Sequence, residues 1–427
     1  MNAPHKVLIV GAGFGGLSCA QKLANDSRFE VTLIDRQNHH LFQPLLYQVA
    51  TAALSAPDIA RSVRAILEKA SNVNVLLDQI EHIDPDKNEA KGKSKTYNYD
   101  SLVLATGVRT SFFGKEEWRD KVSGMKTLAD AHHIRHRFLD ALEEAEKCDD
   151  PKERQRLMTI AIVGGGPTGV ELAGAFAELM NRTLHTNFKN LNPENLRVVI
   201  IEAAPRLLMP YPEDQSAYTK EQLEKEGVEV MVDTMVTDVQ DKKLVLKTGK
   251  EIDAHTIIWA AGMEATRVVN FFEVPKDRAG RFETAPDLSL PGHPNVFAVG
   301  DLVALTDTKD QRVPWVAPAA SQMGRHVAKV LKDDLKLKGR EIQEAKYDAR
   351  PKFAYWDKGM MAIIGRNRAV VKAGAMKLHG FIAWAAWLFI HILFLVGFQN
   401  KISVLVSWAA AYLGNKPGAR VYTNESL

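Results

Sequence analysis

Two glycine-rich segments have residue types and spacings suited to holding a diphosphate. In the first, Gly11, Gly13 and Gly16 directly follow the apolar run at residues 6–10. The first glycine permits a tight turn, the second lets backbone approach a pyrophosphate, and the third lets the next helix pack close to the strand. The amino end of that helix then offers unpaired N–H groups to phosphate. The segment therefore predicts a dinucleotide site.

An acidic residue completes this first pattern. The strand-like run VTLID ends in Asp35, 24 residues after Gly11. A carboxylate at this distance can accept hydrogen bonds from ribose hydroxyls. Strand, glycines, helix and acid occur in the expected order, which favours dinucleotide binding over a purely structural turn.

The same arrangement recurs 153 residues later. Gly164, Gly166 and Gly169 follow the apolar run at 159–163, and the run LRVVIIE ends in Glu202. A carboxylate at this place would repel a 2′-phosphate, so the second site favours NADH over NADPH. The interval before Glu202 is long, and its polar stretch NRTLHTNFKNLNPEN predicts a helix extension and a loop. Two such units predict two different dinucleotides.

The cysteines do not suggest a redox dithiol. Cys19 and Cys148 form no CxxC pair, which fits a reducing compartment. Cys19 falls on the first glycine-motif helix, where a small buried side chain is the simpler interpretation. Disulfide reductases and sulfide oxidases are therefore disfavoured.

The histidine-rich segment DAHHIRHR does not predict a metal site. His132 and His136 have helical i,i+4 spacing and His133 lies between them, yet no carboxylate or Cys completes a ligand set. Arg135 and Arg137 would repel a cation, so we expect a solvated helix face and no metal. No Ser/His/Asp arrangement is evident either, so the chemistry is expected to be the cofactor's.

Composition sets the frame for these sites. The chain has 427 residues, 46% of them hydrophobic and 25% charged, enough for two or three domains. The net charge of +3 hides an asymmetry, because residues 331–427 contain 15 Lys and Arg against 7 Asp and Glu. A strand-like run begins within the first ten residues, so we expect no signal peptide. We expect no nucleic-acid partner.

The basic C-terminal part contains an apolar stretch. Residues 378–400 contain no formal charge, and residues 358–420 contain eight Lys and Arg and no acid. The run at 402–413 places Ser403 and Ser407 on one helical face and apolar side chains elsewhere. Aromatic types that settle at membrane interfaces accompany it: Trp384, Trp387, Trp408 and Tyr412.

Three interpretations of this stretch are open: a buried helical hairpin or dimer interface, a spanning helix, and a monotopic anchor on an anionic leaflet. Twenty-three uncharged residues are long for a core helix. Cations on both sides count against a single span. The monotopic anchor is favoured, with anionic lipid as partner and a homodimer as a further option. Both nucleotide units end by about residue 330, so removal of 378–427 is expected to leave their cores intact.

Three further segments, LVLATG, IIWAAG and NVFAVGD, resemble those of the glutathione-reductase-like flavoproteins with two dinucleotide-binding domains. The resemblance implies an α/β fold with two Rossmann-like domains, to which the C-terminal amphipathic helical membrane-anchoring segment is added. It also implies FAD in the first unit, NADH in the second, and Asp301 against the ribityl and phosphate portion of FAD. The expected FAD-binding domain has two parts, residues 1–115 and 271–330. An inserted NADH-binding domain is expected at 116–270, and a membrane-association region at 331–427.

Over nearly its full length the chain also resembles the type II NADH:quinone oxidoreductases, the single-subunit, non-proton-pumping alternative NADH dehydrogenases. The segments that carry this resemblance are HHLFQPLLYQVA, GGGPTGVELAG, VGD and APAASQMG. It implies that Glu171 points at flavin and nicotinamide. The family's quinone-side motif A-Q-x-A-x-Q-Q is matched at Ala317, Ala320 and Gln322, but Pro318 and Met323 replace its other two Gln residues.

The residues expected at the sites follow from these motifs and resemblances. The catalytic residues are Glu171 and Gln322. The expected FAD contacts are Gly11, Gly13, Phe14, Gly15, Gly16, Asp35, Arg36, Ala105, Thr106, Gly107, Gly300, Asp301 and Ala317. The expected NADH contacts are Gly164, Gly166, Pro167, Thr168, Gly169, Glu202, Ala261 and Gly262. The expected quinone contacts are Pro44, Tyr47, Pro318, Gln322 and Met323.

The implied activity is transfer of two electrons from NADH through FAD to a membrane quinone without proton pumping. The expected location is the cytoplasmic side of a bacterial inner membrane. Two alternatives use the same nucleotide units: a soluble NADH:ferredoxin-type reductase, and a flavin- and NADH-binding signalling protein similar to apoptosis-inducing factor. The soluble reductase would not need residues 378–413.

Overall fold

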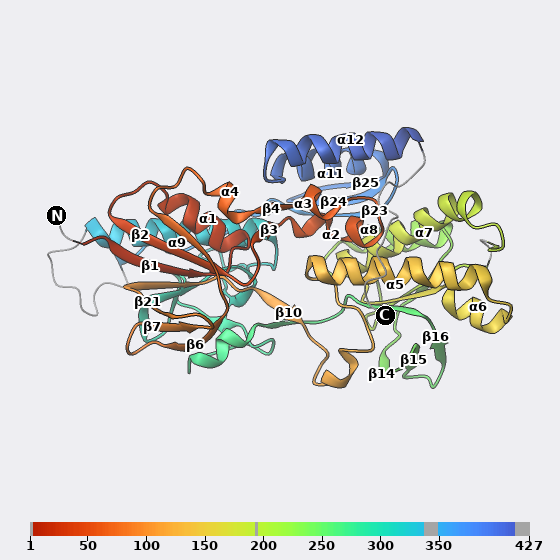
Figure 1. The fold of residues 1–427 in the computed structure, drawn as a ribbon, viewed down its shortest axis with the longest axis horizontal. Coiled ribbons are helices and arrows are strands. Elements are labelled where there is room, and N and C mark those ends of the chain that lie inside the picture. The colour runs from red at the N-terminus through yellow and green to blue at the C-terminus, as the bar shows by residue number, and fades with distance from the viewer. Residues whose placement is uncertain (1–2, 193–194, 337–348, 415–427) are drawn as a thin grey trace. The chain divides into compact units, whose positions relative to one another are not determined.

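A computed structural model describes residues 3–192, 195–336 and 349–414. The chain divides into two compact units, each assembled from separate stretches (Figure 1). Unit 1 comprises Met1–His40, Arg61–Arg109 and Met263–Lys358, and unit 2 comprises Leu41–Ala60, Thr110–Gly262 and Gly359–Leu427. Each glycine motif thus lies in its own unit, and residues 359–427 group with the second motif.

The described part of unit 1 is built on a six-stranded sheet of order β20-β21-β9-β1-β2-β5. Its strands are parallel except for β20, which runs antiparallel to β21. Short, nearly continuous apolar runs form the central strands, as expected where both faces of a parallel sheet are covered. The bounds are β1 His5–Val10, β2 Phe29–Asp35, β5 Val73–Leu77, β9 Ser101–Leu104, β20 Ser289–Leu290 and β21 His293–Ala298.

Helices α1 (Phe14–Leu23) and α9 (Ala317–Lys336) pack on each other beside this sheet (Figure 1). The apolar side of α9 recurs at Ala320, Met323, Val327 and Leu331, a helical spacing that buries one face. Further elements of unit 1 include α4 Val63–Ile66, β6 Ile80–Asp84, β7 Glu89–Gly92, β8 Thr96–Asn98, β18 Met263–Ala265, β19 Phe282–Glu283 and β22 Val303–Ala304.

Unit 2 contains a parallel sheet of order β13-β12-β11-β17. Helix α5 (Leu128–Lys147) begins at a capping box, in which Thr127 and Asp130 each accept a backbone N–H of the other. Helix α7 (Pro167–Asn187) extends well past the glycine motif, as predicted for the polar stretch. The other bounds are β11 Thr159–Val163, β12 Arg197–Ile201, β13 Val228–Met231, β14 Val236–Gln240, β15 Lys243–Leu246, β16 Glu251–Asp253, β17 Thr256–Trp259, α6 Pro151–Leu157 and α8 Glu213–Lys225.

The uncharged run at 378–400 is divided among three elements of unit 2. It begins in β25 (Met376–His379), continues in α11 (Gly380–Phe394), and ends in α12 (Phe398–Gly414). Gly380 and Gly397 have φ of +74° and +97°, so the chain turns at both junctions. Within the described ranges, no helix has the length and apolar character needed to cross a membrane.

Helix α11 packs on the antiparallel sheet β23-β24-β25 and on α12 (Figure 1). Its buried face comprises Ala383, Trp387 and His391, spaced four residues apart. The prediction that Trp387 lies at a membrane interface is wrong, because its side chain is fully buried. The strand bounds are β23 Met360–Gly365 and β24 Arg368–Ala373.

Helix α12 directs polar groups toward the protein. Asn400 donates to the Pro57 and Asp58 carbonyl oxygens, Ser403 donates to the Asp58 carboxylate, and Trp408 donates to Gln48. The predicted serine face is therefore at least partly an inward, docking face. The expectation that 378–427 can be removed without affecting the core also needs correction, because this segment supplies the buried Trp387.

Candidate functional site

The two glycine loops have nearly the same backbone geometry. Gly11 has φ +110° and Gly164 has φ +115°, a region that L side chains rarely adopt. A Cβ on Gly11 would lie 2.3 Å from the Ala105 carbonyl oxygen, and one on Gly164 would lie 2.8 Å from Ala260. Each turn is therefore pressed against the end of the neighbouring strand, where only glycine fits.

The acid of each motif holds its glycine loop in place. The Asp35 carboxylate accepts the Ala12 N–H at 2.7 Å. The Glu202 carboxylate accepts the Gly165 N–H at 2.5 Å and the Ala204 N–H at 2.7 Å. Sequence analysis assigned these acids to ribose and phosphate selection, and the structure adds a role in supporting the loop.

The space around the middle glycines fits a dinucleotide. A Cβ on Gly13 or Gly166 would meet no protein atom within 4 Å, so the backbone there is open to a ligand. Helix α1 has Gly13 as its N-cap and no side-chain capping bond, which leaves its first N–H groups available to phosphate.

The predicted FAD contacts come together at one edge of the unit 1 sheet. They follow the carboxyl ends of β1, β2, β9 and β21, which are parallel neighbours. Ligands of open parallel sheets bind at this edge. Thr106 contacts Thr266 through hydroxyls 2.5 Å apart, Arg36 is exposed, Asp301 lies in the turn after β21, and Ala317 begins α9.

The predicted NADH contacts occupy the equivalent edge of the unit 2 sheet. Gly164, Glu202 and Ala260–Gly262 directly follow β11, β12 and β17, which are adjacent and parallel. Pro167 is the first residue of α7 and Thr168 the second. The sequence order of motifs therefore predicted both edges.

Glu171 lies on the first turns of α7 in unusual surroundings. The helix packs directly on β23, since a Cβ on Gly174 would be 1.7 Å from the Ile364 carbonyl oxygen. Part of the residue remains exposed, but burial of its carboxyl raises the Glu171 pKa to about 8, although a hydrogen bond with the Ile363 backbone acts in the opposite direction. The carboxyl is therefore mainly protonated at neutral pH.

Tyr47 is buried in unit 2, on the short helix α2 (Leu46–Ala50), which packs against α5 and α7. Burial raises the pKa of Tyr47 well above its ordinary value, and the charge of Glu171 adds to the shift. Pro44 precedes it in a short 3-10 helix and is half-buried. Sequence analysis did not single out Gln48, which donates to the Tyr47 hydroxyl at 2.7 Å, because no motif marks it.

The predicted quinone residues of α9 have partners inside unit 1. The Gln322 amide donates to the Trp356 carbonyl oxygen and accepts the Trp356 N–H, both at 3.0 Å. Met323 is buried, and its sulfur lies 3.2 Å from the Gly300 nitrogen. Pro318 is half-buried on the first turn. Met323 thus packs beneath the Gly300–Asp301 turn. Contact of these three residues with quinone stays a prediction.

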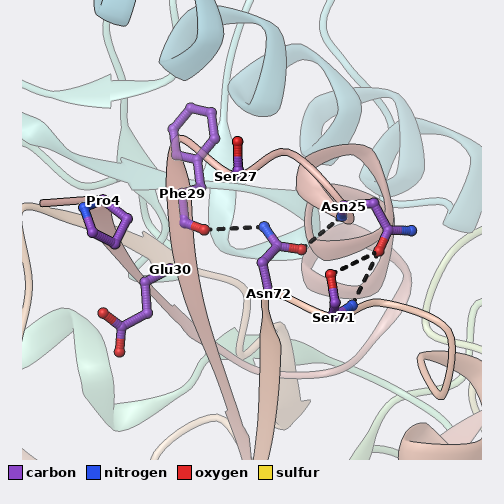
Figure 2. Close-up of a pocket in the computed structure, with 7 residues that line it drawn as sticks. All are labelled: Pro4, Asn25, Ser27, Phe29, Glu30, Ser71 and Asn72. Carbon is purple, nitrogen blue, oxygen red and sulfur yellow. Dashed lines mark hydrogen bonds between the residues drawn. The ribbon is translucent and has the colours of Figure 1, made fainter. Parts of the chain in front are cut away.

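A separate shallow pocket of about 330 Å³ lies at the opposite edge of the unit 1 sheet (Figure 2). It is lined by Pro4, Phe29, Glu30 and Asn72, among others, at the amino ends of β1, β2 and β5. The Asn72 amide donates to the carbonyl oxygens of Leu23, Asp26 and Phe29. These bonds connect the loop before β5 to the loop between α1 and β2. The nucleotide motifs lie at the other edge of the sheet.

The thiols and the histidine-rich segment have ordinary surroundings. Cys19 is fully buried on α1, as predicted, and burial raises the pKa of its thiol to about 12. Cys148 is also a free thiol. On α5, Arg135 contacts the His132 ring nitrogen at 3.1 Å.

Comparisons with known proteins agree with this geometry. A family model described as pyridine nucleotide-disulphide oxidoreductase matches residues 5–324. The type II NADH:quinone oxidoreductase Ndh of Mycobacterium tuberculosis is 40% identical over 433 residues, which cover 99% of this chain and 91% of that protein. The type II NADH:quinone oxidoreductase of Staphylococcus haemolyticus is 28% identical, with 86% and 89% covered.

Solved structures share the fold. The NDH2 of Plasmodium falciparum in complex with NADH aligns with a TM-score of 0.86 at 21% identity, covering 96% of this chain and 98% of that one. The sulfide:quinone oxidoreductase of Aquifex aeolicus aligns with a TM-score of 0.72 at 18% identity, covering 98% and 96%. The predicted α/β fold with two dinucleotide-binding domains is confirmed, and the chain belongs to the pyridine nucleotide-disulphide oxidoreductase family and, within it, to the type II NADH:quinone oxidoreductases.

Proposed function

We propose how the residues of this NADH:quinone oxidoreductase divide the work. The loop and strand ends of unit 1 hold FAD, and the equivalent edge of unit 2 holds NADH. When bound, FAD supplies the two-electron chemistry that connects NADH to quinone. The support for this division is the pair of glycine loops with open backbone at Gly13 and Gly166.

The chain's own groups orient NADH and select it. The glycine loop and the amino end of α7 face the diphosphate, and Glu202 disfavours the 2′-phosphate of NADPH. Because Glu202 also accepts two loop N–H groups, selection and loop geometry depend on the same carboxylate.

Glu171 is proposed to handle a proton. Reduction of a quinone to a quinol takes two electrons and two protons. A carboxyl with a pKa of about 8 holds a proton at neutral pH and can release it to a quinone oxygen, while the hydrogen that NADH gives up accounts for the second proton. Water would then return the proton to Glu171.

The remaining quinone assignments are separate for each unit. In unit 2, Tyr47 is proposed as a hydrogen-bond donor to quinone, with Pro44 as an apolar contact. In unit 1, Gln322 keeps one N–H and one oxygen lone pair after its bonds to Trp356, so it too can contact a carbonyl. Pro318 and Met323 are proposed as apolar neighbours of Gln322.

Helices α11 and α12 are proposed to seat the protein on a lipid surface. Their exposed large side chains are nearly all apolar or aromatic, whereas the polar groups of α12 bond inward, the reverse of an ordinary surface helix. The exposed set is Phe381, Ile382, Phe389, Leu393, Phe394, Phe398, Ile402, Leu405, Val406, Tyr412 and Leu413.

The basic residues contribute less than their number suggests. Arg368 forms an ion pair with Glu226, and Lys377 lies 3.5 Å from Asp214. Lys401 donates to the Leu393 carbonyl oxygen, while Lys416 and Arg420 lie outside the described residues. Apolar burial is therefore proposed as the main attachment, with attraction to anionic lipid as a supplement. We place the protein on the cytoplasmic side of a bacterial inner membrane.

A second copy of the chain is the alternative occupant of this apolar surface. Light scattering of the purified protein with and without anionic vesicles distinguishes the two. A dimer that persists on vesicles with the surface buried would argue against the lipid assignment.

Anaerobic assays of the purified protein test the proposed function. We expect one non-covalent FAD per chain, and one quinol formed per NADH oxidised with a short-chain benzoquinone. Turnover with a ferredoxin but not with quinone would favour the soluble reductase. Tight NADH binding without turnover would favour a signalling protein.

A further inference from the structure

A directed chain of hydrogen bonds connects the outermost helix to the interior of unit 2. The Trp408 indole N–H on α12 donates to the Gln48 amide oxygen, and the N···O distance is 2.7 Å. The Gln48 amide nitrogen then donates to the Tyr47 hydroxyl oxygen, also at 2.7 Å. Gln48 and Tyr47 are adjacent on α2, and both are buried.

The direction of this chain follows from the first donor. An indole nitrogen can only donate, so the Gln48 group facing Trp408 must be the oxygen. The NH₂ group of Gln48 therefore faces Tyr47, and the Tyr47 hydroxyl has to accept. Its own hydrogen is then left for another acceptor, and none of the described residues provides one.

The surroundings of Tyr47 make an unpaired donor costly. Its side chain is 5% exposed. The centroid of the Trp387 ring lies 6.4 Å from that of the Tyr47 ring and 5.8 Å from that of the Trp408 ring. A buried hydroxyl hydrogen that has no acceptor gains strongly from an acceptor that enters the site.

We propose that Trp408 is a positioning residue for quinone reduction: through Gln48 it presents the Tyr47 hydroxyl hydrogen to a quinone carbonyl oxygen. This inference rests on the proposed contact between Tyr47 and quinone. Without the indole N–H, the Gln48 amide is free to turn and accept the Tyr47 hydrogen itself. The docked position of α12 thereby sets the donor capacity of a residue on α2.

Trp408→Phe tests this chain because it keeps an aromatic ring and removes the N–H. The assay uses a short-chain benzoquinone in detergent, so delivery from a bilayer plays no part. We expect the KM for quinone to rise about fivefold to tenfold, the value of one net hydrogen bond, with a smaller change in kcat. Activity with ferricyanide, which has no carbonyl group, should not change.

A double-mutant cycle separates positioning from packing. In a Tyr47→Phe background, Trp408→Phe should have no further effect on the KM for quinone, because no hydroxyl remains to be oriented. Gln48→Met removes the amide that would capture the Tyr47 hydrogen, so in this background too Trp408→Phe should leave the KM for quinone unchanged. Trp118→Phe is the matched control: it removes another indole N–H of unit 2, one that bonds Asp238, and should leave the KM unchanged.

The outcomes are distinguishable. An effect of Trp408→Phe that persists in the Tyr47→Phe background would overturn the positioning role and leave a packing role. A raised KM in Tyr47→Phe with none in Trp408→Phe would overturn the chain but keep the quinone contact. An unchanged KM in Tyr47→Phe would remove Tyr47 from the proposed quinone site.

Discussion

At the scale of single residues, surroundings decide what a carboxylate does. Glu171 and Glu202 both belong to unit 2. Glu202 directly follows β12, and Glu171 lies on α7. Glu202 accepts two backbone N–H groups and so holds the glycine loop. Glu171 is desolvated and keeps its proton, so its pKa is raised to about 8. The same residue type thus serves as a fixed acceptor in one place and a proton carrier in the other.

The raised pKa of Glu171 predicts a pH-dependent stability. Between its ordinary pKa of 4.5 and about 8, the folded protein binds a proton at Glu171 that the unfolded chain has lost. Raising the pH through this window therefore destabilises the folded protein relative to the unfolded chain. We expect Glu171→Gln to remove this part of the pH dependence of folding stability. The Tm of the variant should therefore exceed the Tm of the wild type by a margin that grows from pH 5 to pH 8.

Thermal unfolding of both proteins across that range measures the effect, and turnover should fall in the variant with FAD content unchanged. Parallel Tm curves for variant and wild type, together with full activity, would return Glu171 to an ordinary position on the helix.

Glu202→Gln should narrow the preference for NADH over NADPH. It removes the charge that repels the 2′-phosphate, but the amide has one oxygen for two N–H donors. We therefore also expect kcat/KM for NADH to fall, by about tenfold or more, for one lost hydrogen bond to a charged group. Steady-state kinetics with both nucleotides provide the measurement. Equal kcat/KM values in the wild type would contradict the selectivity assignment.

At the scale of elements, α11 and α12 each have two faces with different tasks. The buried face of α11 holds Trp387 and His391, whose rings stack with centroids 3.9 Å apart. The His391 ring bonds the Trp387 carbonyl oxygen, and burial lowers the pKa of His391 to about 4. The ring is therefore neutral at physiological pH, as suits the core of the unit. The opposite face carries exposed apolar side chains.

Two substitutions on α11 should separate these faces. Trp387→Ala empties a fully buried position and should cost about 3 kcal/mol or more of folding stability. Phe389→Ala removes a side chain that is 68% exposed, so stability should change little while vesicle binding weakens. Denaturant unfolding and vesicle co-sedimentation measure the two effects. Equal destabilisation by both would show that Phe389 is covered within the protein.

A charge introduced on the exposed face of α12 should weaken vesicle binding more strongly than Phe389→Ala does. Val406→Glu places a carboxylate in the apolar face at a residue that is 63% exposed. Glu has a better helix propensity than Val, so α12 should persist. We expect binding to anionic vesicles to fall at least tenfold, with activity toward a short-chain quinone retained. Leu77→Glu, at a position 61% exposed in unit 1, is the matched control and should bind vesicles normally.

At the scale of the whole molecule, the C-terminal segment is part of unit 2. Deletion of residues 378–427 should therefore release the protein from membranes and also destabilise unit 2, since Trp387 and the bonds to Gln48 and Asp58 are lost. All predicted FAD contacts lie in unit 1, so flavin should stay bound. Flavin content, vesicle binding and proteolysis of unit 2 test this. A truncated protein as stable as the full chain would show that the segment is an independent appendage.

High salt and detergent should release the intact protein to different extents. Interaction of lysine and arginine with anionic lipid is worth about 1 kcal/mol per residue near the surface and is screened by salt, whereas apolar burial is not. We expect partial release by high salt and complete release by detergent in sedimentation assays. Complete release by salt alone would contradict an attachment that is mainly apolar.

Short-range signals in the sequence are enough to predict the nucleotide-binding architecture. The signals at Gly11, Gly164, Asp35 and Glu202 are local. A positive φ at a turn, or a loop N–H bonded by an acid at the end of the adjacent strand, depends on short, regular spacings. The order of parallel strands then follows, and with it the edge at which the motifs meet. The family resemblance added Glu171, which its spacing from Gly169 places on the first turns of α7.

Packing between distant segments of the chain determines which side of each C-terminal helix faces inward and how Glu171, Tyr47 and Gln48 are surrounded. Hydropathy shows that residues 378–413 are apolar, but it cannot distinguish Trp387, which fills the interior, from Phe389, which does not. Burial raises the pKa of Glu171 and a hydrogen bond with the Ile363 backbone opposes this, while Trp408 sets the orientation of the Gln48 amide; both partners lie far away in the chain. Desolvation and hydrogen-bond direction are properties of the packed molecule, and no local pattern of residues encodes them.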